Sequence, residues 1–494
     1  MKPRHSLLPL AVMVIATTGC FETQRDETFA DTVVHDDTEI RVLHASPDAP
    51  RLDLLLDGER RLEDLDYGQT RVLTPPADWY DVTLEGRVGQ DTEQTLLKDG
   101  FDRFDEDRRY DLLVAGSADE GDDTLRTVLL VWDEQEDSED GDEDGGDESL
   151  SLRGVHLVES EDDLGELDVF INGDHDEPLT TLDYGEGSES LALDEAVVRI
   201  RLQKPDGDEP LFDSGKRERV PAGEELLVAV VPNTSASADQ DGGSPVKVLI
   251  LNGDEVTTLR NEAEQSSLRF VHAASGSGDL DVVEVKPSGG QTVWEAEESP
   301  EYEEVLPSAD PADFVFLDSG AHVVEVGQGD NGEAQSRDAR WHRGHGRTIL
   351  ALNDADSDLD LKTALNNDRT VATNARVRLF HGSPNVASGS DGPGAIDVYL
   401  LQEDDDLAQE QGVVDTPVFS SLSFRKMSRY EPVPNGDYDL VVTRAGDTSD
   451  ELIRQESVTL SNHGIYDLVF AGEGESNGEG YDFQLIQIGG VPGS

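Results

Sequence analysis

The sequence predicts an all-β protein, built as a tandem array of about four antiparallel β-sandwich modules that are immunoglobulin-like or transthyretin-like. Short β-branched or leucine-rich runs, bounded by Gly, Pro or Asp, recur several times in every hundred residues. A two-part phrase also occurs four times, with its histidines 112, 116 and 109 residues apart, which is the size of one compact domain. No stretch keeps a helical period for three turns.

The repeated phrase consists of Arg, any residue, an apolar residue and His, followed later by Leu or Ile, then Asp, then Val or Leu. The histidine precedes the aspartate by 9 to 16 residues. The pairs are His44 with Asp53, His156 with Asp168, His272 with Asp281, and His381 with Asp397. Each histidine ends the first predicted strand of its module, and each aspartate lies in a strand that follows.

The other elements recur in the same order in each copy. In the first module we expect strands at residues 40–44, 52–56, 80–84, 110–115 and 125–132. The third element follows a Pro/Gly/Asp turn, and its four copies span residues 75–84, 193–202, 318–326 and 434–442. The fourth element spans residues 110–116, 225–231, 348–354 and 466–472.

Breaks in composition indicate the domain boundaries. Residues 134–148 contain no apolar side chain, which predicts a solvated acidic linker. The expected organisation is a signal peptide at 1–19, a lipid-anchored flexible tether at 20–38, modules at 39–133, 150–260, 266–366 and 375–490, and the acidic linker at 134–149. Residues 261–265 and 366–374 are the shorter joints before modules 3 and 4.

The N-terminus has the pattern of a lipoprotein secretion signal. Lys2 and Arg4 precede a ten-residue apolar stretch that is too short to span a bilayer. Cys20 is the only cysteine in the chain and follows Thr-Thr-Gly, which predicts a lipobox and lipidation of Cys20. Phe21, where Asp would favour the inner membrane, favours the outer membrane. We therefore expect an exported protein whose membrane partner is reached through the lipid anchor.

The charge balance is strongly acidic, with 108 Asp and Glu against 38 Lys and Arg and a net charge of −70. Because the acidic residues are spread through every module, they predict a haloadapted surface, as in a halophilic bacterium. The field repels nucleic acid, so no nucleic-acid partner is expected, and it attracts cations weakly and diffusely.

Two of the copies carry a family resemblance. The first, RVLHASPDAP at residues 41–50 followed by LDLLLDG, resembles the bacterial family called domain of unknown function 4397 (DUF4397). The fourth, with RLFHGSPN, IDVYLL and YDLVFAG, is similar to the same family. The resemblance implies a secreted, repeat-built surface protein, and it carries over no catalytic residue.

The histidine and aspartate of each copy admit two interpretations. A catalytic triad would need a nucleophile beside the imidazole. Ser46 and Ser383 lie two residues after their histidines, but Val158 and Ala274 take that place in the other copies. We therefore favour a structural histidine, half-buried, whose nitrogens bond to backbone groups or to the aspartate and fix the register of the strands. No enzyme activity is expected.

No metal or cofactor site is predicted. His342 and His345 are three residues apart, but three arginines surround them, so an exposed basic loop is expected. Residues 140–145 match the first half of an EF-hand loop, yet Ser151 stands where the bidentate acid belongs. Residues 239–243 are similarly incomplete.

Together these features predict a non-enzymatic envelope lipoprotein with a structural, adhesive or spacer role at the cell surface. The alternative is an array of binding modules that recognise a carbohydrate, a peptide or Ca²⁺ through the loops of the sandwiches. Aromatic residues make up only 6% of the chain, and no loop concentrates Trp and Tyr, which weakens the carbohydrate version.

Overall fold

The structure is a computed structural model, and it is described here for residues 37–490. Gaps in this description fall at 90–91, 120–123, 133–149, 160–163, 173–176, 194–196, 206, 208, 217, 220–224, 311, 329–333, 355–357, 387–393, 403–406, 408–415 and 474–481. The predicted signal peptide, Cys20, most of the tether, the acidic linker and the EF-hand-like run therefore lie outside the described residues. Residues from Asp36 onward form one compact unit.

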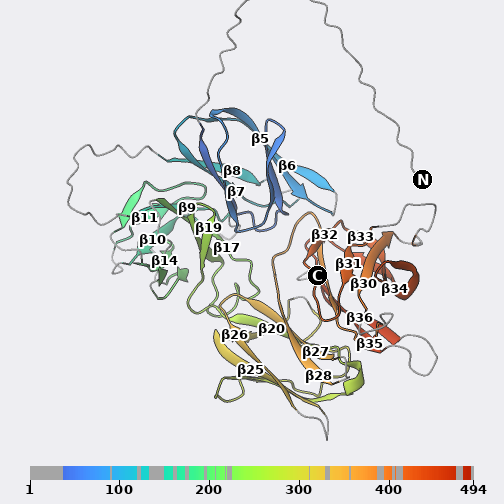
Figure 1. Cartoon of the computed structure of the whole chain (residues 1–494). Coiled ribbons are helices and arrows are strands. Elements are labelled where there is room, and N and C mark those ends of the chain that lie inside the picture. The colour runs from blue at the N-terminus through green and yellow to red at the C-terminus, as the bar shows by residue number, and fades with distance from the viewer. Residues whose placement is uncertain are drawn as a thin grey trace, which may run out of the picture. The chain divides into compact units, whose positions relative to one another are not determined.

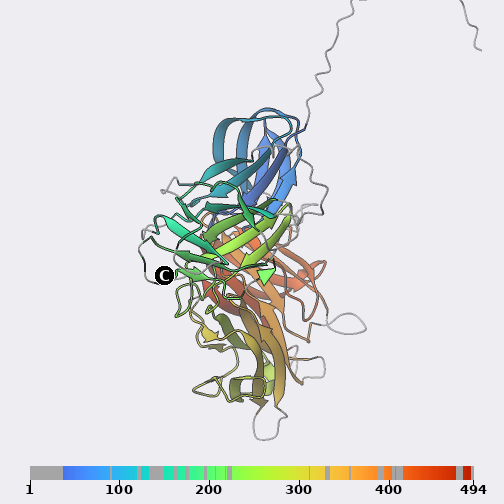
Figure 2. The ribbon, with the colours of Figure 1, turned by 90° about the vertical axis from the view of Figure 1, so that its left-hand side faces the viewer.

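The prediction of an all-β fold is confirmed (Figures 1 and 2). Across the described residues, the one helical element is a 3₁₀ turn, η1 (Ser275–Ser277). In that same part of the chain, no helix has the length and apolar character to cross a membrane. Along the colour gradient of Figure 1 the strands follow one another as four β-sandwiches, here called modules 1 to 4.

Module 1 consists of two four-stranded sheets with the orders β4-β1-β7-β8 and β3-β2-β5-β6. Its strands are β1 (Glu39–His44), β2 (Leu52–Leu56), β3 (Glu59–Leu65), β4 (Thr70–Leu73), β5 (Asp78–Arg87), β6 (Glu93–Phe104), β7 (Arg109–Ala115) and β8 (Arg126–Trp132). Apolar side chains of both sheets, including Val42, Leu54 and Leu112, fill the core between them.

Module 2 repeats this arrangement with the sheets β12-β9-β17-β18-β19 and β11-β10-β14-β15, and a short β13-β16 ribbon. Its strands are β9 (Leu150–His156), β10 (Leu167–Ile171), β11 (Thr180–Leu182), β12 (Leu191–Leu193), β13 (Val197–Val198), β14 (Ile200–Gln203), β15 (Phe212–Asp213), β16 (Glu218–Arg219), β17 (Glu225–Pro232), β18 (Val246–Asn252) and β19 (Glu255–Leu259). Leu152, Val169 and Val228 belong to its core.

Module 3 has the sheets β23-β20-β27-β28, with β24 also paired to β20, and β22-β21-β25-β26. Its strands are β20 (Ser266–His272), β21 (Leu280–Pro287), β22 (Trp294–Glu295), β23 (Val305–Leu306), β24 (Val315–Leu317), β25 (Gly320–Gln328), β26 (Gln335–Trp341), β27 (Gly346–Asn353) and β28 (Leu359–Leu365). Phe270, Val285 and Trp341 lie in its core.

Module 4 has the sheets β32-β29-β35-β36 and β31-β30-β33-β34. Its strands are β29 (Ala375–His381), β30 (Ile396–Gln402), β31 (Phe419–Leu422), β32 (Glu431–Val433), β33 (Gly436–Arg444), β34 (Asp447–Leu460), β35 (Ile465–Glu473) and β36 (Asp482–Gly490). Its core includes Leu379, Val398 and Phe470.

One strand pair in each module is parallel, although the prediction was of antiparallel sandwiches. The histidine-bearing strand runs parallel to the strand of the fourth element, as in β1 with β7 and β29 with β35. The same pairing joins β9 to β17 and β20 to β27. Parallel neighbours need a long crossover, and here the chain makes it by forming strands of the opposite sheet before it returns.

The modules also pack against one another in pairs. Residues on the outer faces of the histidine-bearing sheets form one apolar cluster between modules 1 and 2, which includes Leu43, Leu113, Val155 and Leu227. A second cluster joins modules 3 and 4. This explains why the centre of the fourth element is a continuous apolar run: in β17, Leu226 and Val228 face the core while Leu227 and Ala229 face module 1.

Candidate functional site

The four repeated histidines occupy equivalent buried positions at the ends of β1, β9, β20 and β29. None of their side chains is exposed to solvent. The Nε2 atom of His44 lies 3.0 Å from the carbonyl of Pro50, that of His272 lies 2.8 Å from Gly278, and that of His381 lies 3.0 Å from Gly394. Each carbonyl precedes the aspartate-bearing strand by two residues. Since a carbonyl only accepts, Nε2 must donate in these three modules.

An aromatic ring stands edge-on to each imidazole. The pairs are His44 with Tyr67, His156 with Tyr184, His272 with Tyr302 and His381 with Phe424, with ring centroids 6.0, 6.2, 6.0 and 5.9 Å apart. The next residue has a left-handed backbone in every module, and its N–H donates to the carbonyl of the histidine itself. A donated backbone bond and an aromatic edge thus enclose each histidine, and a carbonyl accepts from Nε2 in modules 1, 3 and 4.

Burial keeps the four imidazoles neutral. It lowers the pKa of His44 to about 3, with the positive charge of Arg369 acting in the same direction. Burial also lowers the pKa of His156 and of His381 to about 4, and that of His272 below its usual value. At neutral pH these side chains therefore hold one proton and have no tendency to take up a second.

The serines that follow two of the histidines form turns. Ser46 Oγ accepts the N–H of Ala49 and lies 3.2 Å from the carboxylate of Asp48. Ser383 Oγ donates to the carbonyl of Gly472 at 3.0 Å. Neither hydroxyl bonds to its histidine in the contacts that the structure describes, so the geometry contains no serine–histidine pair.

The repeated aspartates have a separate role. Asp53 accepts the N–H of Asp64 at 2.7 Å, and Asp397 accepts the N–H of Ser421 at 2.6 Å. Both donors have positive φ angles and lie opposite a break in strand register, so the carboxylates stabilise β-bulges.

The aspartates of modules 2 and 3 make different contacts from those of modules 1 and 4. Asp168 accepts from the hydroxyl of Thr181 at 2.7 Å, while Asp281 is exposed. The sequence left two partners open for the histidine nitrogens, backbone groups and the aspartate. In the structure the partners are backbone groups. The aspartates instead contact the neighbouring strand and its turns.

The arginine of the phrase differs between modules. Arg41 forms a two-pronged ion pair with Asp111 at 2.7 and 3.0 Å, and Trp132 Nε1 donates to the same carboxylate. Arg378 and Asp467 form the matching pair in module 4, both contacts at 2.6 Å. The register places Leu227 opposite Arg153 and Thr348 opposite Arg269, so these two arginines bond to backbone carbonyls instead.

The joint before module 4 is buried, although its composition resembles a surface linker. Arg369 is 4% exposed and donates to the carbonyls of Pro47 and Ala49 and to the carboxylate of Asp66, all in module 1. Asp368 is half-buried, and this burial raises its pKa. We call residues 366–369, together with the side chains and carbonyls that contact them, the central junction.

The joint before module 3 is polar and enclosed in the same way. The side chain of Glu264 is fully buried and lies 3.1 Å from Arg260. Its Oε1 atom also accepts hydrogen bonds from Ser235 and Asn233. Both joints therefore bring charged side chains into the interior of the unit, where partners on other modules are required.

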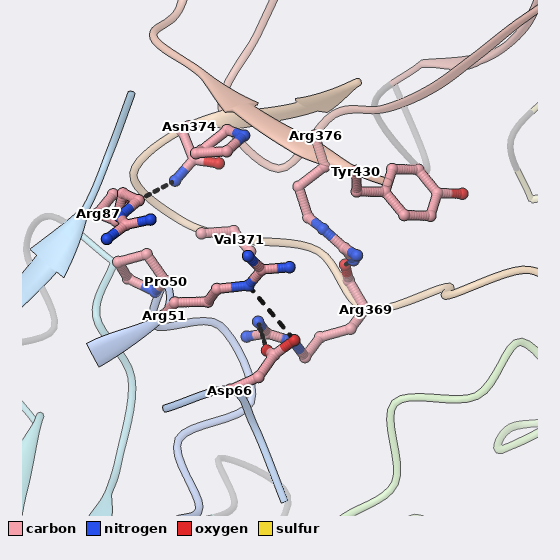
Figure 3. A pocket seen from close by; sticks show the side chains of 10 residues that line it. Pro50, Arg51, Asp66, Arg87, Arg369, Val371, Asn374, Arg376 and Tyr430 are labelled. Carbon is pink, nitrogen blue, oxygen red and sulfur yellow. Dashed lines mark hydrogen bonds and ion pairs between the residues drawn. The ribbon is translucent and has the colours of Figure 1, made fainter. Parts of the chain in front are cut away.

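Three cavities surround the central junction. One of about 30 Å³ is lined by Arg51, Arg87, Arg369 and Arg376 (Figure 3). The largest, about 280 Å³, combines apolar walls such as Phe314 with the charged groups of Arg269, Asp368 and Asp467. Asp239 and Gln240, from the incomplete calcium-like run, also line it.

The third cavity, about 260 Å³, is lined in part by a buried amine. Lys247 lies 4.2 Å from the centre of the Tyr67 ring. Burial lowers the pKa of Lys247 to about 7, and the neighbouring charges of Arg260 and Arg369 act in the same direction. His345 lines the same cavity, and both His342 and His345 are exposed, as predicted for this loop. Among the described residues, no group of three or more His, Cys, Asp or Glu side chains could hold a metal ion.

The match to a protein family concerns the first module. Residues 38–143 match the family described as "Domain of unknown function (DUF4397)". This match agrees with the resemblance of the first copy, and it covers module 1 alone. No curated protein sequence matches the chain.

Two solved structures show weak similarity. The Bacillus anthracis TIE protein is 12% identical with a TM-score of 0.16, over 85% of this chain and 65% of that one. This chain thus spans less than two thirds of the TIE protein. A putative cell adhesion protein from Bacteroides ovatus is 11% identical with a TM-score of 0.16, over 44% of this chain and 95% of that one. Scores of this size carry no argument about fold or function.

Proposed function

We propose that the chain is a non-enzymatic, exported surface protein with a structural or adhesive role, held in the cell envelope by a lipid on Cys20. The observation that carries the proposal is the enclosure of the repeated histidines. They are the side chains best suited to proton transfer, yet all four are buried, neutral and surrounded by their own modules. What the chain repeats four times is a folding contact.

Contacts between modules favour the interpretation that the chain is a rigid unit and not a flexible spacer. Apolar clusters join modules 1 and 2 and modules 3 and 4, and Arg369 connects the joint before module 4 to module 1. A rigid unit of this kind transmits force and keeps its outer surface in one arrangement, as an adhesive or envelope protein requires.

Anchoring is tested by replacing the predicted lipid attachment site. Cys20→Ala should move the protein from the detergent-soluble membrane fraction to the periplasm or medium and abolish labelling by a radioactive fatty acid. Phe21→Asp is the matched variant: it should stay lipidated and, in a host with two membranes, shift to the inner one. A wild-type protein without lipid would refute the anchor.

The acidic surface supports the proposal of a halophilic host with diffuse cation attraction. Raising KCl to about 1 M, where the Debye length is roughly 3 Å, should raise the melting temperature steeply. Excess KCl should raise the melting temperature nearly as much as millimolar Ca²⁺ does, because screening of charge needs no specific site. A large effect of Ca²⁺ that persists in 1 M KCl would contradict this and favour specific calcium sites.

A second candidate function is ligand binding, and the cavities favour it. They lie between modules at the central junction, whereas the sequence led us to expect binding at the loops of single sandwiches. A binding function at the junction needs the assembled unit, because the lining residues come from several modules.

A further inference from the structure

Lys247 is the one charged residue of β18, and it is buried. Val246 and Val248 on either side of it face the core of module 2. Because side chains alternate along a strand, Lys247 lies on the same face as Leu249, which packs against module 1. It is only 8% exposed. An ammonium group in such a place is costly unless a negative partner balances it.

No such partner contacts the amine among the described residues. Their hydrogen bonds and ion pairs do not include Nζ of Lys247, which instead lies 4.2 Å from the centre of the Tyr67 ring. The hydroxyl of Tyr67 donates to the carbonyl of Pro232. The structure thus leaves the nitrogen of a buried lysine without an acceptor.

The surrounding charges favour the neutral amine. Burial is the main reason that the pKa of Lys247 falls to about 7, and the positive charges of Arg260 and Arg369 lower it further. Glu264 and Asp66 act in the opposite direction but more weakly, and each already binds one of these arginines. A neutral amine keeps its lone pair and is a nucleophile. The same positive field would stabilise a negative group formed on the nitrogen.

The amine lines a cavity of about 260 Å³, which has room for a small molecule. Thr234 and Asn367 line it as well, and in the described part of the chain neither the Thr234 hydroxyl nor Asn367 Nδ2 donates a hydrogen bond. Both groups are therefore available to an anion at Nζ. Asp368 also lines the cavity, but burial raises the pKa of its carboxyl, which weakens its repulsion of an anion.

We propose that Lys247 captures carbon dioxide and is carboxylated to a carbamate. The lone pair of neutral Nζ attacks the carbon of carbon dioxide, and a C–N bond forms while one C=O π pair moves to oxygen. The nitrogen then loses a proton to solvent, which leaves Nζ–H bonded to a carboxylate. An aldehyde would give an imine, which is neutral or, when protonated, positive, so the two arginines favour the carbamate. The site goes beyond the proposed function, since it does not depend on where the chain is anchored.

The test is to trap carbamates on the purified full chain and map them. The chain is incubated with ¹³C-bicarbonate at about pH 8, where an ordinary lysine, with a pKa of about 10.4, is almost wholly protonated. Triethyloxonium then converts carbamates to stable esters, which mass spectrometry of the peptides locates. Lys247 should carry at least about tenfold more label than any other lysine. Lys286 is the internal control, because Glu284 and Glu325 bind its ammonium and raise its pKa.

Variants provide a second measurement by ¹³C NMR. Lys247→Arg keeps the positive charge but removes the nucleophile, so it should lose a carbamate signal that the wild type and Lys286→Arg both show. If Lys247→Arg melts early, Lys247→Met replaces it, and the mapping of the wild type needs no variant. Label on Lys247 no greater than on Lys286 would overturn the proposal. So would a carbamate spectrum of the Lys247 variant that matches that of the wild type.

Discussion

Modules 1 and 4 differ from modules 2 and 3 in one buried ion pair. Arg41 with Asp111 and Arg378 with Asp467 are two-pronged pairs, whereas Leu227 and Thr348 occupy the aspartate position in modules 2 and 3. The histidine with its aromatic neighbour is present in all four. The histidine–aromatic contact occurs in all four modules and therefore stabilises the individual sandwich. The arginine–aspartate ion pair occurs in two modules and is connected with the packing of modules in pairs.

The interfaces explain this distribution, because each pair of modules holds one such carboxylate. Arg41 also donates to the carbonyl of Leu251 in module 2, and Arg153 of module 2 donates to the carbonyl of Val131 in module 1. Arg378 likewise donates to the carbonyl of Leu365 in module 3. In each pair, the arginine that binds the buried carboxylate thus also donates to a carbonyl of the neighbouring module.

The largest expected effect is a loss of stability in mild acid, and it should be common to all modules. The folded pKa values of the histidines lie below the unfolded value of about 6.5, so the unfolded chain binds protons first. Stability is complete above pH 6.5 and falls as the pH decreases. Between pH 6.5 and 5, His44, His156 and His381 should each remove up to about 1.4 kcal/mol per pH unit from the free energy of unfolding, and His272 should act in the same direction.

Denaturant titrations at each pH measure this slope. Ordinary carboxylates, with pKa values near 4, stay charged in that range and contribute little. A slope near zero between pH 6.5 and 5 would contradict neutral, buried histidines.

The next effect should separate the two kinds of module. Asp111→Asn leaves the guanidinium of Arg41 buried without its counter-charge, which should cost about 3 to 5 kcal/mol of unfolding free energy. Thr348→Val, at the equivalent position of module 3, removes one hydrogen bond to Asn366 and should cost about 1 kcal/mol. Urea unfolding of both variants compares them, and equal losses would show that the ion pair has no special role.

Replacing the repeated histidine should lower the unfolding free energy equally in both kinds of module. His44→Ala and His156→Ala should each cost about 1 to 3 kcal/mol, because a buried polar group loses its partner and an aromatic edge loses its contact. Guanidinium unfolding provides the measurement. A variant with wild-type stability that loses an activity or a ligand would mean that the histidine is functional after all.

Much of the module was predictable from the sequence, because its strands follow the alternation of buried positions. The expected strand 52–56 coincides with β2, and 40–44 and 110–115 lie within β1 and β7. The short edge strand β3 was missed because its sequence is mostly charged and exposed. Parallel pairing of β1 with β7 could not be predicted from local patterns, since it depends on a crossover through the other sheet.

The contacts outside the strands were harder to predict. The aromatic partner follows its histidine at 23, 28, 30 and 43 residues, so no fixed spacing marks it. The central junction was missed because residues 366–374 read as a polar linker. One signal was present: the continuous apolar run of β17 is typical of a strand that is buried on both faces, and it indicated the packing between modules.

The smallest expected effect concerns the residue after each aromatic ring, where modules 1 and 2 have glycine. Gly68 has a φ of 74°, and Glu303 adopts the same φ of 74° in module 3. A Cβ atom at Gly68 would make only an ordinary contact with Leu249, at 3.9 Å. Gly68→Ala should therefore cost about 1 kcal/mol from backbone strain alone, and Glu303→Gly should gain a similar amount. Melting temperatures that shift in the opposite directions would contradict the shared geometry.

The central claim, that the repeated histidine is a buried and neutral part of the fold, is tested most directly by NMR of the chain labelled with ¹⁵N in its histidine rings. Single His→Gln variants assign the four signals. The imidazoles of His44, His156 and His381 should stay neutral from pH 7 to 5, and that of His272 should titrate below the usual range. The imidazoles of His44, His272 and His381 should carry their proton on Nε2. Titration of these four signals near pH 6.5, or a proton on Nδ1, would contradict the account.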